Sequence, residues 1–222
     1  MKIVSYNIET EIDFSKCDVY DLVIENSNMY YDVTNKLIKM SNGEEQNDIV
    51  LSDNNQEISL GKIGEIIYNF YDLDINNKKI QGLVFKHLIE IAKENDFYIE
   101  LANINQSLMD FYTKLLTSQE LNVCCDTDIS LDNIIKLGNF KFEESNKLIE
   151  KLVDYIDVLN KLKPLNMIIL IDAFSVLSLD EVEKFIKQMK YLNLKILFVN
   201  PFVKYDITNA KRIIVDQDLC EI

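Results

Sequence analysis

The chain has 222 residues, of which 48% are hydrophobic and 27% are charged, and its formal net charge at pH 7 is −14. A chain of this length buries about 70% of the surface that its unfolded form exposes, so it can form a sizeable core. Its five Gly and two Pro exclude collagen-like repeats, low-complexity disorder and a loop-rich disulfide scaffold. The acidic balance opposes non-specific binding to phosphate backbones, because surfaces that bind nucleic acid are normally basic.

The amino-terminal residues predict no export. Residues 1–9 (MKIVSYNIE) lack the uninterrupted apolar stretch and the small-residue cleavage site of a signal peptide. The longest strongly apolar run, 167–171, is far shorter than the roughly 20 residues that cross a bilayer. We therefore expect a cytoplasmic protein that does not associate with membranes.

The first predicted element is a strand over 18–25 (DVYDLVIE), which has Val, Leu and Ile at its centre. Polar residues 26–28 follow as a cap, and the apolar spacing of 29–40 predicts a helix. A second short strand is expected at 48–51, before a turn at 53–55. This order of strand, loop and helix indicates an α/β layer.

The middle of the chain is predicted to be helical. Apolar residues recur at helical spacing from Lys78 onward, and the pattern continues over 99–116. It breaks at the Asp- and Ser-rich stretch 125–130 and resumes from Ser145, so three helices can form a leg. The only histidine, His87, lies on the apolar stripe, and we interpret it as a core or interface residue rather than a catalytic base.

The last third of the chain returns to strands. Pro164 ends the preceding helix, and the apolar run 167–171 is typical of a strand buried on both faces, which we expect at the centre of the sheet. Ser178 and Glu181 have the spacing of a capping box and predict the start of a helix. Two further strands are predicted, at 195–199 and 211–215.

The predicted fold class is α/β, with a head built from both chain ends and an inserted α-helical leg. We expect residues 1–64 and 164–222 to form the head and residues 65–163 to form the leg. The head is similar in layout to a P-loop NTPase, with an apolar strand that ends in Asp172. Asp172 could be a metal ligand, but an Asp at a strand end also caps the following turn, and we favour the cap.

The sequence does not predict an enzyme. Residues 26–31 lack the glycines and the Lys-Ser/Thr pair that hold phosphates and magnesium, so the phosphate loop is degenerate. Four cysteines without CxxC spacing and a single histidine do not make a zinc site, and no GxSxG elbow is present. A nucleotide-dependent enzyme with a diverged loop stays open as an alternative.

Carboxylates concentrate between residues 120 and 132 (ELNVCCDTDISLD), around a predicted interhelical turn. The oxygen-bearing residues are Glu120, Asp126, Asp128 and Asp132. Calcium accepts six to eight oxygens in loose geometry, so this segment suits calcium better than zinc. The Gly and the terminal Glu of an EF-hand loop are missing. On spacing alone, a solvated acidic turn is the alternative.

The tract 167–201 (MIILIDAFSVLSLDEVEKFIKQMKYLNLKILFVNP) resembles the type II-A CRISPR-associated Csn family. That family has, in this order, an apolar strand, a short loop, a helix that starts with Ser/Thr-x-Asp-Glu-Val, and a second strand before a Pro. Residues 179–182 (LDEV) match the helix start, and Asn200-Pro201 match the end of the second strand. Residues 22–26 (LVIEN) are similar to its incomplete phosphate loop, and 60–75 (LGKIGEIIYNFYDLDI) to the segment that enters its leg. The similarity extends over residues 18–216.

This resemblance implies a non-catalytic homotetrameric ring that binds calcium. It implies sequence-independent binding of linear double-stranded DNA, at its ends, in a Lys-lined channel during CRISPR adaptation (spacer acquisition). The implied partners are the integrase pair and the RNA-guided nuclease. The calcium ligands of the family fall nearest 120–132, where Cys124 and Cys125 replace acidic residues, so that Glu120, Asp126, Asp128 and Asp132 remain.

The lysines expected to contact DNA form a local basic series. They are Lys136, Lys141, Lys147 and Lys151, and four subunits would bring sixteen of them (4 × 4) together. Arg212 is the single arginine, so the planar fork that reads guanine edges is nearly absent, and DNA contacts should ignore sequence. The same lysines could be ordinary solvated helix residues. A further alternative is an acidic protein-only adaptor or scaffold that recruits basic partners.

Overall fold

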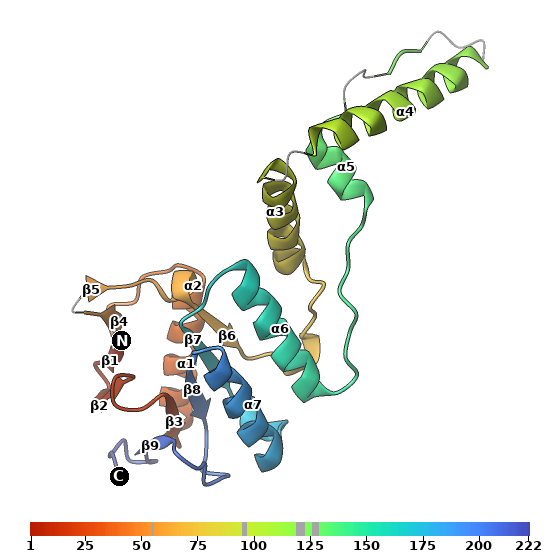
Figure 1. Cartoon of the computed structure of the whole chain (residues 1–222). Helices are drawn as coiled ribbons and strands as arrows, with labels where there is room; N and C mark the ends of the chain where they lie inside the picture. Colours follow the sequence, from red (N-terminus) through yellow and green to blue (C-terminus); the bar gives the residue numbers. More distant parts are fainter. Residues whose placement is uncertain (55, 95–96, 119–122, 126–128) are drawn as a thin grey trace. The chain divides into compact units, whose positions relative to one another are not determined.

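A computed structural model of the chain describes residues 1–222 except 55, 95–96, 119–122 and 126–128 (Figure 1). The chain forms two compact units. The head unit comprises Met1–Asp74 and Glu144–Ile222, and the leg unit comprises Ile75–Glu143. The predicted α/β class is confirmed, because helices pack on a parallel sheet in the head unit.

The parallel sheet of the head unit has five strands in the order β6-β7-β8-β3-β9. They are β3 (Val19–Ile24), β6 (Gly64–Ile67), β7 (Met167–Ile171), β8 (Lys195–Asn200) and β9 (Lys211–Val215). The strands predicted at the positions of β3, β7, β8 and β9 are confirmed. The prediction that β7 is the central strand is wrong, since β6 pairs with its outer side and β8 takes the middle place.

Helices cover both faces of this sheet. They are α1 (Ser27–Ser41) on one face and α6 (Leu148–Leu162) and α7 (Leu179–Tyr191) on the other (Figure 1). Successive strand residues point to opposite faces, so Leu22 joins the buried cluster that includes Val33 of α1. On the other face, the ring of Phe198 lies 6.5 Å from the ring of Phe185 of α7. The sheet is therefore buried on both sides, as its apolar strands require.

Helix α6 belongs to the head unit, whereas the expected leg ran to residue 163. Its side chains Leu152, Ile156 and Leu159 are fully buried, and it packs against α7. The hydroxyl of Tyr155 donates a hydrogen bond to Glu65 Oε1 at 3.1 Å. Apolar periodicity predicts that this helix buries one face, but it does not indicate which neighbour covers that face.

A second, antiparallel sheet of four strands completes the head unit, in the order β2-β1-β4-β5. Its strands are β1 (Lys2–Ser5), β2 (Ile8–Asp13), β4 (Ile49–Asp53) and β5 (Gln56–Glu57). Only β4 corresponds to a predicted strand. Ile3, Ile12 and Leu51 are buried in the same core cluster as α1, so this sheet closes the α1 side of the head unit.

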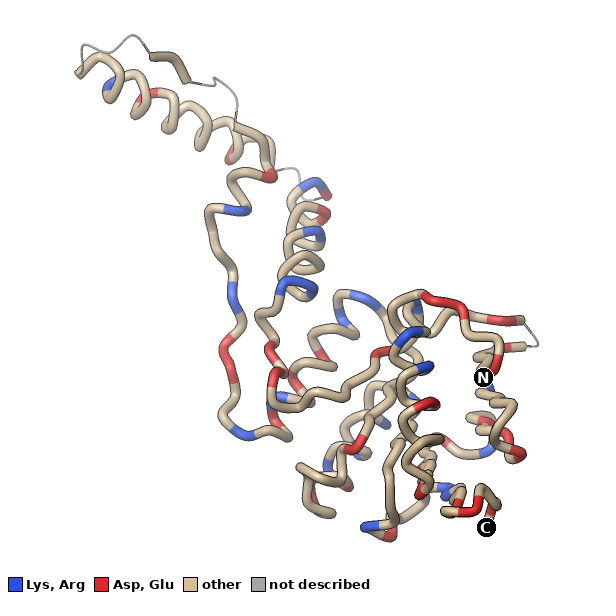
Figure 2. The backbone as a smooth tube through the Cα atoms, turned by 180° about the vertical axis from the view of Figure 1, so that it is seen from behind, with Lys and Arg blue, Asp and Glu red and all other residues tan. Residues whose placement is uncertain are grey.

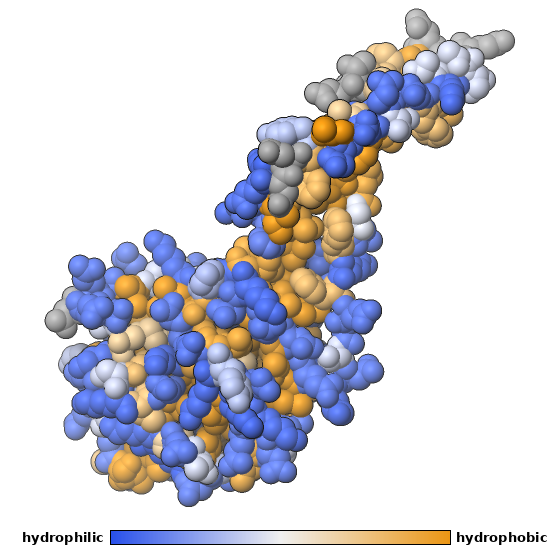
Figure 3. Space-filling view, viewed as in Figure 1, coloured by the Kyte–Doolittle hydropathy of each residue, from blue (hydrophilic) through white to orange (hydrophobic). Residues whose placement is uncertain are grey.

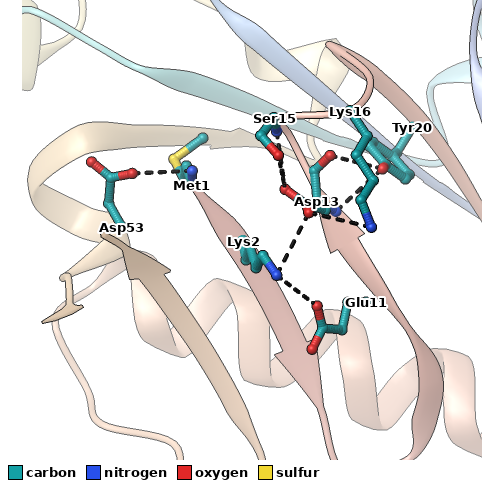
Figure 4. A network of polar contacts seen from close by, with 8 residues as sticks. All are labelled: Met1, Lys2, Glu11, Asp13, Ser15, Lys16, Tyr20 and Asp53. Carbon is teal, nitrogen blue, oxygen red and sulfur yellow. Dashed lines mark hydrogen bonds and ion pairs between the residues drawn. The ribbon is translucent and has the colours of Figure 1, made fainter. Parts of the chain in front are cut away.

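Polar contacts fix one end of β2 (Figure 4). Asp13 is 3% exposed, and its carboxylate accepts hydrogen bonds from the Ser15 hydroxyl at 2.7 Å and the Ser15 N–H at 3.0 Å. The Nζ atoms of Lys2 and Lys16 each lie 3.6 Å from Asp13 Oδ2. These hydrogen bonds, and then the two lysines, lower the pKa of Asp13 to about 2. The Tyr20 hydroxyl donates to the Asp13 carbonyl oxygen at 2.9 Å.

Three short elements link the strands of the head unit. They are α2 (Leu60–Ile63), η1 (Phe70–Asp72) and η2 (Ala173–Ser175). Gly61 lets α2 approach the end of α1 closely, since a Cβ atom there would lie 2.5 Å from the Ser41 carbonyl oxygen. The predicted capping box is present at the start of α7, where the Glu181 carboxylate accepts from both the N–H and the hydroxyl of Ser178.

The leg unit contains α3 (Lys78–Glu94), α4 (Tyr98–Thr117) and α5 (Leu131–Leu137). The helices predicted at α3 and α4 are confirmed, and α5 was not predicted. Asn76 pairs with both backbone groups of Phe142 at 2.8 and 3.0 Å, and Asn105 does the same with Ile129 at 3.1 and 3.2 Å. These amides tie the segments on either side of α5 to the rest of the unit. In the part of the chain that the structure describes, no helix is long and apolar enough to span a membrane.

Candidate functional site

The first candidate site is the carboxyl end of the parallel sheet, where open α/β folds bind ligands at a switch in strand order. That switch lies at β3, which sits between β8 and β9. Only Glu25 and Asn26 separate β3 from α1, too few residues to wrap a phosphate. Asn26 Oδ1 accepts hydrogen bonds from the N–H groups of Asn28 at 3.2 Å and Met29 at 3.1 Å. The Asn26 side chain therefore accepts from the same backbone N–H groups that would bind a phosphate at a helix N-terminus.

Neighbouring groups at this edge also bond to one another. Asn26 Nδ2 donates to the carbonyl oxygen of Gln217 at 3.0 Å. Asp172 has a φ of 54°, and its carboxylate accepts a hydrogen bond from the Ser175 hydroxyl. Among the described residues no backbone N–H of the following turn donates to this carboxylate, so the side chain contacts the turn through Ser175 and does not cap it as predicted. Burial, and then the charge of Asp172, raise the pKa of Tyr30 above its ordinary value. A carboxylate close to this position disfavours a bound phosphate.

A buried ion pair lies within the same sheet. Asp21 is 1% exposed, and its carboxylate accepts from Arg212 Nε at 2.9 Å and from Asn200 Nδ2 at 2.9 Å. Arg212 Nη2 also donates to the carbonyl oxygen of Tyr205. Burial raises the pKa of Asp21 in spite of both hydrogen bonds. The single arginine of the chain therefore bonds to two other segments of the head unit.

Two of the lysines predicted to bind DNA belong to the leg unit. Lys136 is exposed on α5, and its Nζ lies 5.1 Å from the centroid of the Phe85 ring of α3. Lys141 is exposed in the segment that follows α5. Lys136 is therefore next to α3, where a cation over an aromatic ring is held in place without losing its exposure.

The other two predicted lysines belong to the head unit, at the start of α6. Lys147 Nζ lies 3.1 Å from Glu150 Oε1, and Lys151 Nζ lies 3.7 Å from Glu144 Oε2. Exposed pairs of this kind contribute about 0–1 kcal/mol each, so a phosphate could replace the carboxylates. The structure thus divides the predicted series into two pairs, one on each unit.

The lysines of α3 were not among those predicted from the sequence. Lys79, Lys86 and Lys93 are exposed and seven residues apart, which is close to two helical turns, so they follow one side of the helix. Figure 2 shows basic positions recurring along α3. Residues 78–93 contain four lysines and one glutamate, which makes this stretch basic within an acidic chain. The seven-residue spacing was the available signal, because it marks one helix face even when the lysines are far apart in sequence.

The predicted calcium ligands lie mostly beyond the described residues. Glu120, Asp126 and Asp128 fall outside them, while Asp132 is exposed in the first turn of α5. Among the residues that the structure describes, no three His, Cys, Asp or Glu side chains are grouped to hold a metal ion. The four carboxylates fit calcium by their oxygen chemistry, and the described part of the chain contributes one of them.

The chain matches a protein-family model over residues 41–219, and that family is described as CRISPR-associated protein (Cas_Csn2). The matched span runs from the end of α1 to beyond β9 and includes the whole leg unit. No individually curated protein matches the chain. Because the family model covers well over half of the sequence, the chain belongs to the Cas_Csn2 family and has a CRISPR-associated role.

Proposed function

We propose that this protein is a non-catalytic DNA-end-binding protein of CRISPR adaptation. It forms a homotetrameric ring in the cytoplasm, holds linear double-stranded DNA in a lysine-lined channel, and acts with the integrase pair and the RNA-guided nuclease. Family membership supports the CRISPR role. The observation that carries the DNA-binding part is the lysine stripe of α3, Lys79, Lys86 and Lys93, with Lys136 beside it.

The stripe suits phosphates rather than bases. Its lysines repeat about every 10 Å along the helix, at 1.5 Å per residue. Lysine is a compact charge that contacts phosphates without reading base edges, so binding is independent of sequence. A tetramer carries a formal charge of −56 (4 × −14), so the attraction is local and acts against a repulsive background. DNA binding should therefore weaken steeply as salt rises.

Self-association is supported by the unburied apolar face of α4. None of its residues is buried, although apolar side chains recur at alternating spacings of three and four residues. They are Leu101, Ile104, Leu108, Phe111 and Leu115. This spacing is that of a helix seam that packs against another helix. Phe111 is 58% exposed and Leu115 is 52% exposed, and Figure 3 shows hydrophobic residues at the surface of the leg unit. A second subunit would remove this apolar surface from water.

The absence of catalysis is supported by the carboxyl end of β3. Asn26 caps α1 with its own side chain, and only two residues link β3 to α1. Nucleotide hydrolysis needs a glycine-rich loop whose amides face the phosphates. The rival hypothesis of a diverged nucleotide-dependent enzyme predicts ATP hydrolysis by the purified protein, and our proposal predicts none above background.

Calcium completes the proposal as a ligand of Glu120, Asp126, Asp128 and Asp132. Bound calcium would offset four carboxylates of the leg unit, the unit that also carries the α3 lysines. Replacing all four residues with their amides should abolish calcium binding measured by calorimetry. Unchanged calcium affinity in that variant would refute the assignment.

The principal test is a mobility shift with linear and covalently closed circular double-stranded DNA, in calcium and then with chelator. The proposal expects calcium-dependent binding of linear DNA alone, because a ring is threaded only from an end. Equal binding of both DNA forms would refute threading. No binding of either form would favour the protein-only adaptor, which the overall charge of −14 also suits.

Matched charge reversals locate the DNA contacts. Lys86→Glu/Lys93→Glu changes the α3 stripe, and Lys184→Glu/Lys187→Glu makes the same charge change on exposed positions of α7. The α3 variant should bind more weakly, and the slope of log affinity against log salt should shrink by roughly 0.9 per lost phosphate contact. Equal effects of the two variants would show that only net charge matters.

A further inference from the structure

Strand β2 is the outer strand of the antiparallel sheet, and β1 is its one neighbour among the described strands. Between Ile3 and Ser5 of β1 the register of this pair shifts, because residues 9–11 of β2 stand opposite a single residue of β1. Such a bulge leaves backbone groups out of the ladder. The N–H groups of Glu9 and Thr10 lie in the bulge, so they can bond to an acceptor from another part of the chain.

The carboxylate of Glu221 accepts hydrogen bonds from both of these N–H groups. Thr10 N–H donates to Glu221 Oε2 at 3.0 Å and to Oε1 at 3.2 Å, and Glu9 N–H also donates to Oε1. Successive backbone N–H groups of this kind form a concave site for an anion. At the other end of β2, the Tyr20 hydroxyl accepts from the N–H of Asp13 at 3.2 Å. Side chains thus occupy N–H groups of β2 that do not bond to β1.

Glu221 belongs to a segment, residues 216–222, that we call the strap. The strap turns back along β9, where Ile222 N–H donates to Ile214 O at 3.0 Å. Its turn is held by Asp216 Oδ1, which accepts from two backbone N–H groups of the strap at 2.8 and 2.9 Å. These contacts fix the strap to an edge strand of the parallel sheet, while Glu221 fixes it to the edge strand of the antiparallel sheet.

The strap also contacts the turn between β3 and α1. Gln217 Nε2 donates to the carbonyl oxygen of Glu25 at 2.7 Å, and Gln217 O accepts from Asn26 Nδ2 at 3.0 Å. All of these residues lie in the head unit. The strap therefore joins three parts of one compact unit, and the contact with β2 is the one that Glu221 provides.

We propose that the strap is a closing device that keeps the outer edge of β2 from pairing with β2 of a second copy of this chain. An unpaired strand edge is a template for another chain, and proteins cover such edges to avoid edge-to-edge association. A second copy presents the same edge, so the two strands could pair about a two-fold axis. The exposed side chains of Glu9 and Glu11 oppose this pairing by like charge, and the strap adds a barrier that salt screens less. The inference goes beyond the proposed function, because it needs neither DNA nor calcium.

Hydrogen exchange with mass spectrometry on the full chain, without DNA and calcium, tests the contact itself. At low protein concentration, Glu221→Ala should speed exchange over residues 8–13 about fivefold, since one net hydrogen bond is worth about this factor. Asp218→Ala removes the same charge from an exposed position of the strap and should leave exchange over residues 8–13 unchanged. Unchanged exchange in Glu221→Ala, or equal effects of the two variants, would overturn the proposal.

Sedimentation velocity tests the effect on self-association. As protein concentration rises, Glu221→Ala should form species larger than those of the unchanged chain, and raising salt from about 0.15 M to about 0.5 M should increase them by screening the β2 glutamates. Exchange over residues 8–13 should then slow again, which locates the pairing at β2. Glu221→Gln replaces the alanine variant if that one unfolds. Association no greater than that of Asp218→Ala, or slower exchange only outside residues 8–13, would overturn the proposal.

Discussion

Replacing Arg212 with Met would leave a buried carboxylate without its cation. Asp21 is 1% exposed and bonds to Arg212 Nε at 2.9 Å, so the variant removes its ionic partner from a site that water does not reach. Losing one partner of a buried pair costs about 3–5 kcal/mol. Because the Arg212 side chain is 24% exposed, we expect a free-energy loss near the lower end, about 3 kcal/mol. That is a large part of the 5–15 kcal/mol that stabilises a typical domain.

The loss should depend on pH in a defined direction. Burial already raises the pKa of Asp21, and removing Arg212 removes the attraction that opposes burial. A carboxyl whose pKa is raised on folding destabilises the folded state progressively above its ordinary pKa near 4, and fully above the raised pKa, so protonation relieves this cost as the pH falls. The variant should therefore lose more stability at pH 7 than at pH 5.

Urea unfolding of four proteins at both pH values measures these effects: the unchanged chain, Arg212→Met, Asp21→Asn and the double variant. The double variant should be more stable than Arg212→Met alone, because no buried charge is left. Lys211→Met, on the adjacent exposed position of β9, is the control for losing one positive charge. A loss below about 1 kcal/mol, or one equal to that of the control, would refute the reasoning, since such values are typical of surface changes.

Three other variants test separate features. Asp13→Asn should lower the melting temperature less at pH 2.5 than at pH 7. The Ser15 hydrogen bonds lower the Asp13 pKa to about 2. The stabilisation by the ionised Asp13 carboxylate is therefore fully present above the ordinary pKa near 4 and fades as the pH falls toward 2. Asn26→Ala should cost about 1 kcal/mol in urea unfolding, from loss of the α1 cap, and should not create ATP hydrolysis. Ile156→Ala should cost about 2–5 kcal/mol as a cavity in the head unit, whereas Leu137→Ala, at a 75% exposed position, should cost little.

The sequence predicted those parts of the fold whose signal is local. Continuous apolar runs predicted β3, β7, β8 and β9, because a strand covered on both faces has no polar face. Strand β2 was missed although its residues alternate, with Ile8, Thr10 and Ile12 on one side. Glu residues alternate with these side chains, because only one face of β2 is buried. The strand therefore has no continuous apolar run of the kind that marks β3, β7, β8 and β9.

The remaining differences depend on neighbours that a linear pattern does not specify. Helix α6 would show the same apolar periodicity whether it packed in a leg or on the sheet. Its contacts with α7 and with Glu65 are what place it in the head unit. The predicted lysine series was chosen by closeness along the chain, and its members Lys147 and Lys151 lie near Glu150 and Glu144. A helix groups residues by period, so spacing by seven was the signal for the α3 lysines, of which Lys86 lies 3.8 Å from Glu90.

A local excess of lysine reconciles an acidic protein with a proposed role at DNA. Residues 78–93 have four lysines and one glutamate, whereas the chain as a whole has 37 acidic and 23 basic residues. Phosphate binding by lysines releases counterions and weakens steeply as salt rises. Because the remaining acidic surface adds no favourable contact with phosphates, DNA binding should rest on a few lysine–phosphate contacts and should be lost at modest ionic strength.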